Sequence, residues 1–336
     1  MKKKIRILFL MVFSLLIFFC LFSMSIGKYP ISIPDIIKTL CGTGTKMQET
    51  VIYSIRFPRI CVAVFVGAAL AVSGCILQTV TKNELAEPGI IGINAGSSLA
   101  VILLISAGSM HYYDEIRNGT VFLMPFVSIL GAFLAAMIIY GLSLRKRKVT
   151  PTRFLLVGIG VNAGINAAIT VFQLNMSKGD YNQALTWISG SLWGTSWRYF
   201  YFLAPITLLM IFLTMQKSRV MDVMDLGDEL ATGLGVSVER ERRILLFYAV
   251  VLAAMATAVA GNIAFLGLLG PHIAKKLCGP MHARQIPLAA GISAIIIVAA
   301  DLISKNLFSP LEIPVGITIS LIGVPYFVFL MMKQKD

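Results

Sequence analysis

The sequence predicts an all-α, polytopic membrane protein, and three observations lead to that fold class. The 336 residues are 57% hydrophobic and 13% charged, with a mean hydropathy of +0.83, whereas a soluble globular domain carries about 25% charged residues. The apolar residues come in blocks of roughly 16 to 25 residues, which are long enough to cross a bilayer as helices. The basic residues gather at the ends of these blocks. Such clusters are typical of topology signals beside anionic lipid and disfavour a nucleic acid as the partner.

About ten of these blocks are expected to cross the membrane. The first follows four positive charges and lacks the AxA-like cleavage site of a signal peptide, so we interpret it as a spanning helix. The basic run 145–148 and the basic residues of 217–243 then lie inside, as the positive-inside rule requires. We predict one transmembrane permease domain over residues 1–336, with both termini cytoplasmic. The predicted crossings are residues 7–26, 60–80, about 90–106, 121–142, 153–174, 199–215, 244–260, a short 263–277, 286–303 and 313–332.

The segments between the crossings carry further expectations. Residues 28–59 are expected to form an outer segment that is broken by prolines and holds a short amphipathic piece around Asp35 to Leu40. An outer loop is expected at residues 111–120, and a tryptophan-rich outer segment follows the fifth crossing, as is typical of a membrane interface. Residues 217–243, the most charged part of the chain, are expected to form a cytoplasmic loop with a short acidic helix that is ended by glycine.

Two stretches of the sequence resemble each other weakly. VSGCILQ…LAEPGIIG in the first half and VAGNIAF…GLLGPHIAKK in the second both place small residues before a turn that is broken by proline. Because five crossings separate them, the two stretches would have opposite orientations, as in an inverted repeat. Chance similarity between helices rich in Gly and Ala is the alternative.

The sequence offers little for catalysis or metal binding. The GTGTK at 42–46 lacks the spacing of a P-loop, and the five cysteines and three histidines show no ligand spacing, so we expect no ATP site, cofactor, metal or disulfide. No carboxylate pair lies inside an apolar block, and Asp301 lies at a helix end. This disfavours both an intramembrane enzyme and a proton-coupled carrier. We therefore expect a transport protein, not an enzyme, that is driven by another subunit.

The chain resembles the permease subunits of ABC importers for ferric siderophores, haem and cobalamin, the FecCD-type permease family. The matching blocks are ordered along nearly the whole chain. They are RFPR (56–59), GAALAVSG (67–74), NELAEPG (83–89), WISGSL (187–192), LGDELATGLGV (226–236), AGNIAFLGLLGPHIAKK (260–276), Asp301, and EIPVG (312–316) with Gly323 and Pro325. One departure is Glu84, where the family usually has proline, and it leaves the shape of this hinge open.

The resemblance implies three groups of site residues. Arg56, Arg59 and Lys305 would receive acidic residues of an external substrate-binding protein, although lysine at position 305 lacks the planar fork of the family's arginine; snorkelling cations at the interface are the alternative reading. The segment that would contact a cytoplasmic ATPase includes Asp228, Glu229, Ala231, Leu234 and Gly235. The residues expected along the translocation path and its inner gate are Thr150, Thr152, Asn162 and Asn166, for which structural packing is the alternative reading.

The resemblance also implies the function. We expect the permease to translocate a ferric siderophore across the cytoplasmic membrane of a prokaryote by alternating access, together with two ATPase subunits, a binding protein and a second permease subunit. Haem or cobalamin is the alternative cargo, because no residue in the chain identifies the substrate. An ATPase-independent secondary transporter is the alternative from another class, and Na⁺ coupling through backbone carbonyls would be compatible with the sequence. A structural membrane scaffold is a third reading.

Overall fold

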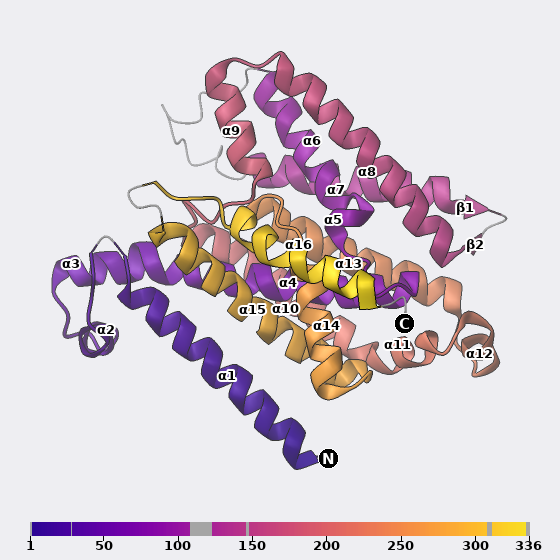
Figure 1. The fold of residues 1–336 in the computed structure, drawn as a ribbon, viewed down its shortest axis with the longest axis horizontal. Coiled ribbons are helices and arrows are strands. Elements are labelled where there is room, and N and C mark those ends of the chain that lie inside the picture. The colour runs from indigo at the N-terminus through magenta and orange to yellow at the C-terminus, as the bar shows by residue number, and fades with distance from the viewer. Residues whose placement is uncertain (1, 28, 108–122, 146–147, 308–310, 334–336) are drawn as a thin grey trace.

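The computed structural model describes residues 2–27, 29–107, 123–145, 148–307 and 311–333. Most of these residues are helical, which confirms the predicted all-α fold class (Figure 1). Eight helical segments in the described part of the chain are long and apolar enough to span a membrane. They are α1 (Lys2–Ser25), the continuous helix of α3 (Lys46–Glu49), η1 (Thr50–Arg56) and α4 (Phe57–Thr81), then α7 (Leu123–Ser143), α8 (Pro151–Leu174), α10 (Trp197–Gln216), α13 (Val238–Ala260), α15 (His282–Asn306) and α16 (Val315–Lys333).

The third predicted crossing is shorter than expected, and the eighth is short as predicted. They correspond to α6 (Ile93–Ser106), with 14 residues, and α14 (Leu266–Cys278), with 13 residues. Helices of these lengths extend about 20 Å, less than the ~30 Å hydrocarbon core. Each predicted crossing therefore has a helix, but two of the ten are too short to span the membrane alone.

The segment before α4 differs from the prediction. The short amphipathic piece is confirmed as α2 (Ile33–Leu40), where the Ser32 hydroxyl accepts the backbone N–H of Asp35 as an N-cap. However, the chain becomes helical again at Lys46 and continues unbroken to Thr81, a length of 36 residues. A capping box of Thr45 and Gln48 starts this helix. Polar residues near its start hid the helix from an analysis based on hydropathy alone.

The remaining elements are short connections. The inner turn after α7 is a two-stranded antiparallel hairpin of β1 and β2, and a helix, α9, lies in the predicted tryptophan-rich outer segment. The expected outer loop at 111–120 lies outside the described residues, as do residues 146–147 of the basic run. These elements are α5 (Pro88–Ile91), β1 (Leu144–Arg145), β2 (Lys148–Val149), α9 (Lys178–Ile188), α11 (Ser218–Asp225) and α12 (Asp228–Gly233).

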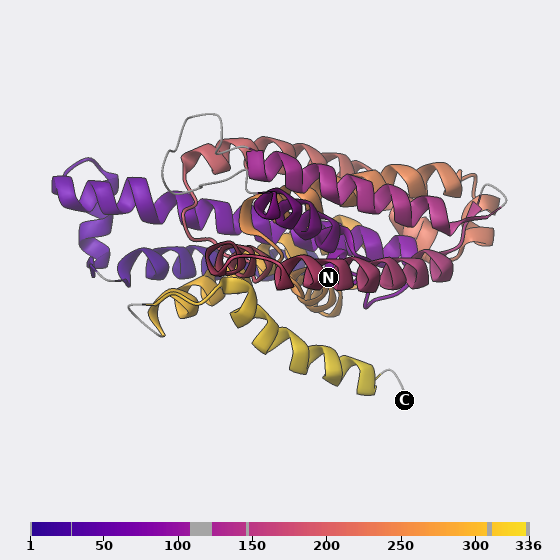
Figure 2. The same cartoon turned by 90° about the horizontal axis from the view of Figure 1, so that it is seen from above.

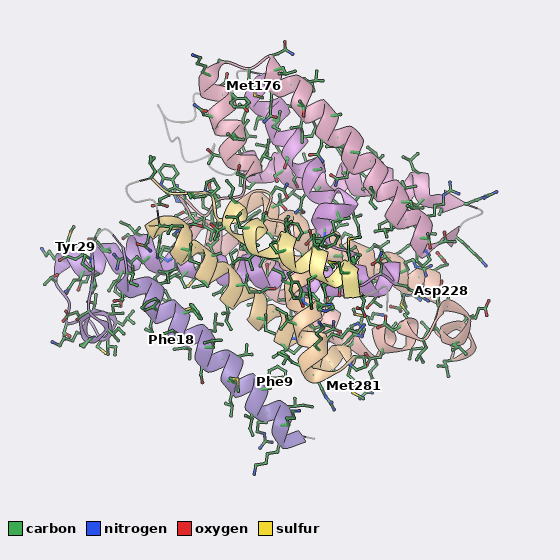
Figure 3. The ribbon with its side chains drawn as sticks, in the orientation of Figure 1. Phe9, Phe18, Tyr29, Met176, Asp228 and Met281 are labelled. Atoms are coloured by element: carbon green, nitrogen blue, oxygen red, sulfur yellow. The ribbon has the colours of Figure 1, made fainter. Side chains whose placement is uncertain are left out.

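The core of the bundle is formed by α4, α13 and α15. In the most apolar stretch of the α3–η1–α4 helix, 78% of the residues are buried, whereas in that of α1 only 11% are buried. On α1, Phe18 is 55% exposed and stacks on Phe22, so this helix presents an aromatic surface to its surroundings (Figure 3). The contacts between helices also repeat. If the two halves of the chain are aligned with an offset of five crossings, α4 corresponds to α13 and α7 to α15. The contact of α4 with α15 then corresponds to the contact of α13 with α7, and α4 packs on its own counterpart α13. This pairing is compatible with the predicted inverted repeat.

The two ends of the bundle carry different elements. The β hairpin and α12 lie at one end, on the right of Figure 1, and α2 and α3 lie at the opposite end. Figure 2 shows the same separation from above. The predicted topology makes the hairpin end the cytoplasmic one.

Candidate functional site

Two breaks in the helices meet in the middle of the bundle. The break between α4 and α6 contains α5, and the other break separates α13 from α14. A Cβ on Gly74 would lie 1.9 Å from the carbonyl oxygen of Gly267, so the two backbones approach as only glycine permits. Glu87, which is 2% exposed, accepts the backbone N–H of Phe265 at 3.1 Å. The two stretches that resemble each other in sequence therefore lie in contact.

A buried amide extends this junction. Asn94 at the start of α6 accepts a hydrogen bond from the Thr257 hydroxyl at 3.2 Å. Its Nδ2 donates to Oδ1 of Asn262 at 3.1 Å. The side chain thus joins α6, α13 and the segment before α14. Neither Asn94 nor Glu87 was predicted as a site residue. In the sequence, Glu87 lies in a polar segment that is broken by proline, and Asn94 lies in the Gly- and Ser-rich segment after it, so neither residue stands out from its neighbours.

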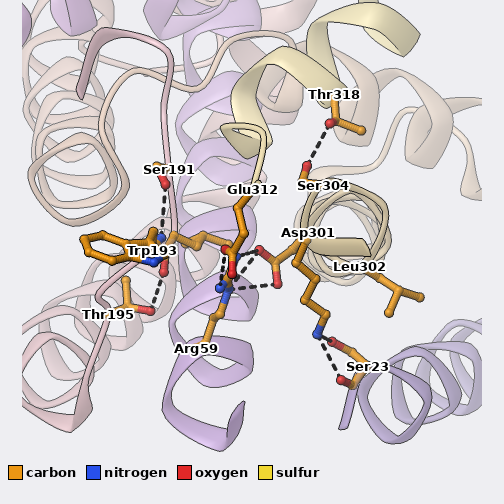
Figure 4. Close-up of polar contacts among 12 residues, drawn as sticks. Ser23, Arg59, Ser191, Trp193, Thr195, Asp301, Leu302, Ser304, Glu312 and Thr318 are labelled. Carbon is orange, nitrogen blue, oxygen red and sulfur yellow. Dashed lines mark hydrogen bonds and ion pairs between the residues drawn. The ribbon is translucent and has the colours of Figure 1, made fainter. Parts of the chain in front are cut away.

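Arg59, in the first turn of α4, lies in a cluster of charges (Figure 4). Its guanidinium forms ion pairs with Asp301 at 2.8 Å and with Glu312 at 2.9 Å. The Asp301 side chain is 2% exposed, whereas that of Glu312 is 28% exposed. On the next turn of α15, Lys305 donates to the backbone carbonyl and the hydroxyl of Ser23 at 3.0 and 2.9 Å. Two predicted docking residues are therefore close together, and both are already paired within the chain.

Arg56, the third predicted docking residue, is enclosed by the chain. It is 8% exposed, and its guanidinium donates to the backbone carbonyls of Met24 and Tyr29. The last carbonyls of a helix lack partners inside the helix, and a basic side chain that bonds them acts as a C-terminal cap. The contacts give Arg56 a structural task at the end of α1, and they do not favour a direct contact with another protein.

The predicted acidic helix of the inner loop is confirmed as α12. Glycines with positive φ flank it, Gly227 at +117° and Gly235 at +87°. Leu230 within the helix is 61% exposed, and Leu226 before it and Leu234 directly after it are 59% and 66% exposed. The non-helical backbone of Gly227 separates Leu226 from the helix, so the spacing of four residues places only Leu230 and Leu234 on one face. These three exposed leucines, called the leucine stripe below, are typical of an interaction surface.

The predicted ATPase-contact residues divide into two sets. Glu229, Leu234 and Gly235 are exposed, and the structure leaves them accessible to a partner. Ala231 is fully buried and packs inward. Asp228 is committed to contacts within the chain: Lys82 lies 2.7 Å from one carboxylate oxygen, and Arg242 lies 2.7 Å from the other. Burial raises the pKa of Asp228, but the hydrogen bonds from these two cations outweigh it and hold the pKa below its usual value.

The predicted path residues all lie on or next to α8. Thr150 is the N-cap residue of this helix, and Thr152 in its first turn is exposed. Asn162 donates from Nδ2 to the carbonyls of Gly89 and Ile90 at 3.1 and 3.2 Å, and so ties α8 to α5. Asn166 is exposed and donates to Oδ1 of Asn162 at 2.8 Å. The structure thus brings the two asparagines together and leaves both threonines about 15–24 Å away along the helix.

The unusual Glu84 has a defined role in the hinge after α4. Its carboxylate pairs with Lys275 of α14 at 2.7 Å, and His272 lies 4.0 Å away. The hydrogen bond from Lys275 lowers the pKa of Glu84 below its ordinary value, against the opposing effect of burial. The hinge after α4 is therefore joined to α14 by an ion pair.

Comparison with known proteins places the chain in a family. A family model of the FecCD transport family matches residues 15–333. The chain belongs to the FecCD transport family. The iron(3+)-hydroxamate import system permease protein FhuG of Bacillus subtilis (strain 168) is 46% identical and covers 99% of this chain and 98% of that protein. The hemin transport system permease protein HmuU of Yersinia pestis is 34% identical over 96% of this chain and 94% of that protein.

A solved structure agrees with this assignment. It is an inward-facing conformation of a protein described as a metal-chelate type ABC transporter, with a TM-score of 0.85, 28% sequence identity and coverage of 98% of this chain and 99% of that one. The FecCD chain described above is therefore a multi-pass membrane permease of the ABC importer class. The predicted family, fold class and membrane location are confirmed.

Proposed function

We propose that this FecCD permease translocates a ferric hydroxamate siderophore across the cytoplasmic membrane, driven by ATP hydrolysis on a partner subunit. The observation that carries the substrate class is the 46% identity over 99% of the chain to a permease named for iron(3+)-hydroxamate, against 34% to one named for hemin. The proposed assembly contains two cytoplasmic ATPases, a second permease subunit and an external substrate-binding protein.

The leucine stripe on α12 supports the contact with the ATPase. Leu226, Leu230 and Leu234 expose apolar surface at the end of the bundle that is assigned to the cytoplasm. Their burial in a cleft of a partner would contribute about 1–2 kcal/mol each. The exposed residues Glu229 and Gly235, each next to one of these leucines in the chain, complete the proposed contact. Asp228 and Ala231 support it from within the chain.

The cluster around Arg59 supports docking of the binding protein at the opposite end. Glu312 is the more exposed partner of Arg59, so an acidic residue of a docking protein could replace it while Asp301 stays in place. Lys305 adds positive charge next to this site. Arg59→Gln is expected to weaken binding of the binding protein to nanodisc-embedded permease while the ATPase stays bound.

The open face of α8 supports a role in the translocation path. A Cβ on Gly160 or Gly164 would meet no atom within 4 Å, and Asn166 is exposed beside them. Small residues and amides on an exposed transmembrane face suit close approach by a second helix or a polar solute. In this proposal Asn162 and Asn166 line the path, and Thr150 and Thr152 form part of its inner gate.

The experiment that tests the proposal is uptake of radioactive iron by cells that lack their own hydroxamate permease. Cells that express this chain with its partner genes should accumulate iron from a ferric hydroxamate and not from haemin or ferric citrate. Leu230→Asp should abolish uptake and release the ATPase from the purified complex. Leu277→Asp, at the exposed end of α14, is the matched control and should retain both. Uptake from haemin alone would refute the substrate class, and full uptake by Leu230→Asp would refute the α12 contact.

A further inference from the structure

We infer that Arg242 is the positioning residue that joins α12 to the inner ends of α4 and α8. This inference rests on the proposed function, because it concerns how movement at the ATPase contact reaches the translocation path. It concerns a residue in the first turns of α13 that touches neither the predicted path nor the exposed leucines.

The burial of Arg242 is unusual for an arginine. Only 1% of the residue is exposed, and it is the largest of the fully buried side chains in the described chain. An arginine is almost never fully buried unless it is paired, and leaving its charge without a partner is strongly unfavourable. Any movement of the groups bonded to Arg242 must therefore carry the guanidinium along or replace its bonds at once.

The guanidinium bonds three different parts of the chain. Nη2 donates to the Asp228 carboxylate at 2.7 Å. Nη1 donates to Glu239 at 2.7 Å and to the backbone carbonyl of Val149 at 2.9 Å. The planar fork of arginine can hold such partners in fixed directions, which a lysine ammonium cannot do. Arg242 thus connects α12, α13 and β2 in one rigid contact.

The Val149 arm leads to the start of α8. Val149 is 1% exposed, ends β2 and immediately precedes Thr150, the N-cap residue of α8. Pro151 then fixes the first helical position. No flexible segment separates the bonded carbonyl from the helix, so a displacement of β2 is passed on to the first turn of α8.

The Asp228 arm leads to α4. One carboxylate oxygen bonds Arg242 and the other bonds Lys82, which caps the C-terminus of α4 in a left-handed conformation at φ +51°. Asp228 is the first residue of α12, and Figure 3 shows it at the same end of the bundle as the hairpin. One carboxylate therefore fastens α12 to both α4 and Arg242.

The backbone around α12 permits the movement that this link would transmit. Gly227 and Gly235 have positive φ values, and a Cβ on either would meet no atom within 4 Å. The helix can therefore pivot at both ends while Asp228 holds its first turn. A push on the leucine stripe would reach α8 and α4 through Arg242 and Lys82.

The test separates transmission from simple stabilisation by measuring two activities of one complex. Permease, ATPase and binding protein are reconstituted in liposomes, and ferric hydroxamate uptake and ATP hydrolysis are measured together. Arg242→Lys keeps the charge but loses the fork. We expect hydrolysis to stay above about half of the wild-type rate while uptake per ATP falls about tenfold. Arg243→Lys, at the exposed neighbouring arginine, is the matched control and should stay within about twofold of wild type.

A second variant and the double variant make the test decisive. Asp228→Asn cuts the same link from its more exposed side and should lower the uptake per ATP as well. The double variant should be no worse than the worse single variant, because both variants break the connection between Arg242 and Asp228, while Asp228→Asn also weakens the pair with Lys82. Wild-type uptake per ATP in Arg242→Lys, or equal losses of hydrolysis and uptake, would overturn the inference. If Arg242→Lys does not assemble, Asp228→Asn decides by the same ratio. Absence of ATP-driven uptake in the wild type would instead refute the proposed function.

Discussion

The close approach of Gly74 to the backbone of Gly267 gives a sharp prediction for Gly74→Ala. The added Cβ would lie 1.9 Å from the carbonyl oxygen of Gly267, whereas carbon and oxygen normally approach to about 3.3 Å. The helix must therefore shift by about 1.4 Å, and a backbone oxygen cannot rotate away. Overpacking of this kind costs about 1–3 kcal/mol, and the helix propensity of alanine returns up to about 1 kcal/mol. Because the required shift of about 1.4 Å is large, we take the upper end of this cost and expect a net loss of about 2 kcal/mol.

The assay is thermal unfolding of the purified permease in detergent, followed by the loss of the monodisperse peak in size-exclusion chromatography. In a chain of 336 residues, a loss of about 2 kcal/mol lowers the midpoint by about 3 °C. Gly267→Ala should lose less, because its Cβ would meet its nearest atoms at 3.0 and 3.1 Å. Gly141→Ala, where nothing lies within 4 Å, is the control and should show no loss. A midpoint for Gly74→Ala that equals the wild-type value would refute this account of the junction.

Two further predictions concern ion pairs. Asp301→Ala should lower the free energy of unfolding by about 3 kcal/mol, and Glu312→Ala should lower it by about 1 kcal/mol or less. The reason is that only Asp301→Ala leaves Arg59 without its buried partner. Equal shifts in the thermal midpoint of the two variants would contradict this ranking. Glu84 has a pKa below its ordinary 4.5, because of the hydrogen bond from Lys275. Its contribution should be present above that value and be lost as the pH falls through the lowered pKa. The half-exposed pair contributes about 1 kcal/mol or less, so the midpoint of Glu84→Gln should lie below that of the wild type at pH 7 and meet it in acid; a constant difference would contradict the assignment.

The sequence was sufficient to predict the helices, because hydropathy and basic flanks encode membrane crossings directly. It also predicted α12, whose acidic start and terminal glycine are local signals. It predicted that the crossing at α14 is short, but it did not reveal that α6 is short as well, since the apolar residues that border α6 extend the hydropathy signal beyond it. It also did not reveal that the second crossing helix begins at Lys46. The first residues of that helix are polar, and hydropathy does not report helices formed by polar residues.

The contacts of the charged residues could not be predicted in the same way. Arg59 and Asp301 are 242 positions apart, and no local pattern reports that they meet. Ala231 and Leu230 are neighbours in one helix, yet one is fully buried and the other is 61% exposed, which depends on the surface that α12 rests against. The family blocks identified the segments that matter. Which side chains face inward in those segments follows only from the packing.

The continuous helix from Lys46 to Thr81 connects the two sides of the membrane, so a rotation at one end moves the other end. Its 36 residues extend about 54 Å, so about 24 Å of it exceeds the thickness of the hydrocarbon core. Lys82, directly after its inner end, is held by Asp228 of α12. A tilt of about 5° around that point would displace the outer end by about 5 Å. One continuous helix thus connects the two sides of the membrane, and a small rotation of its inner end displaces its outer end by several ångströms.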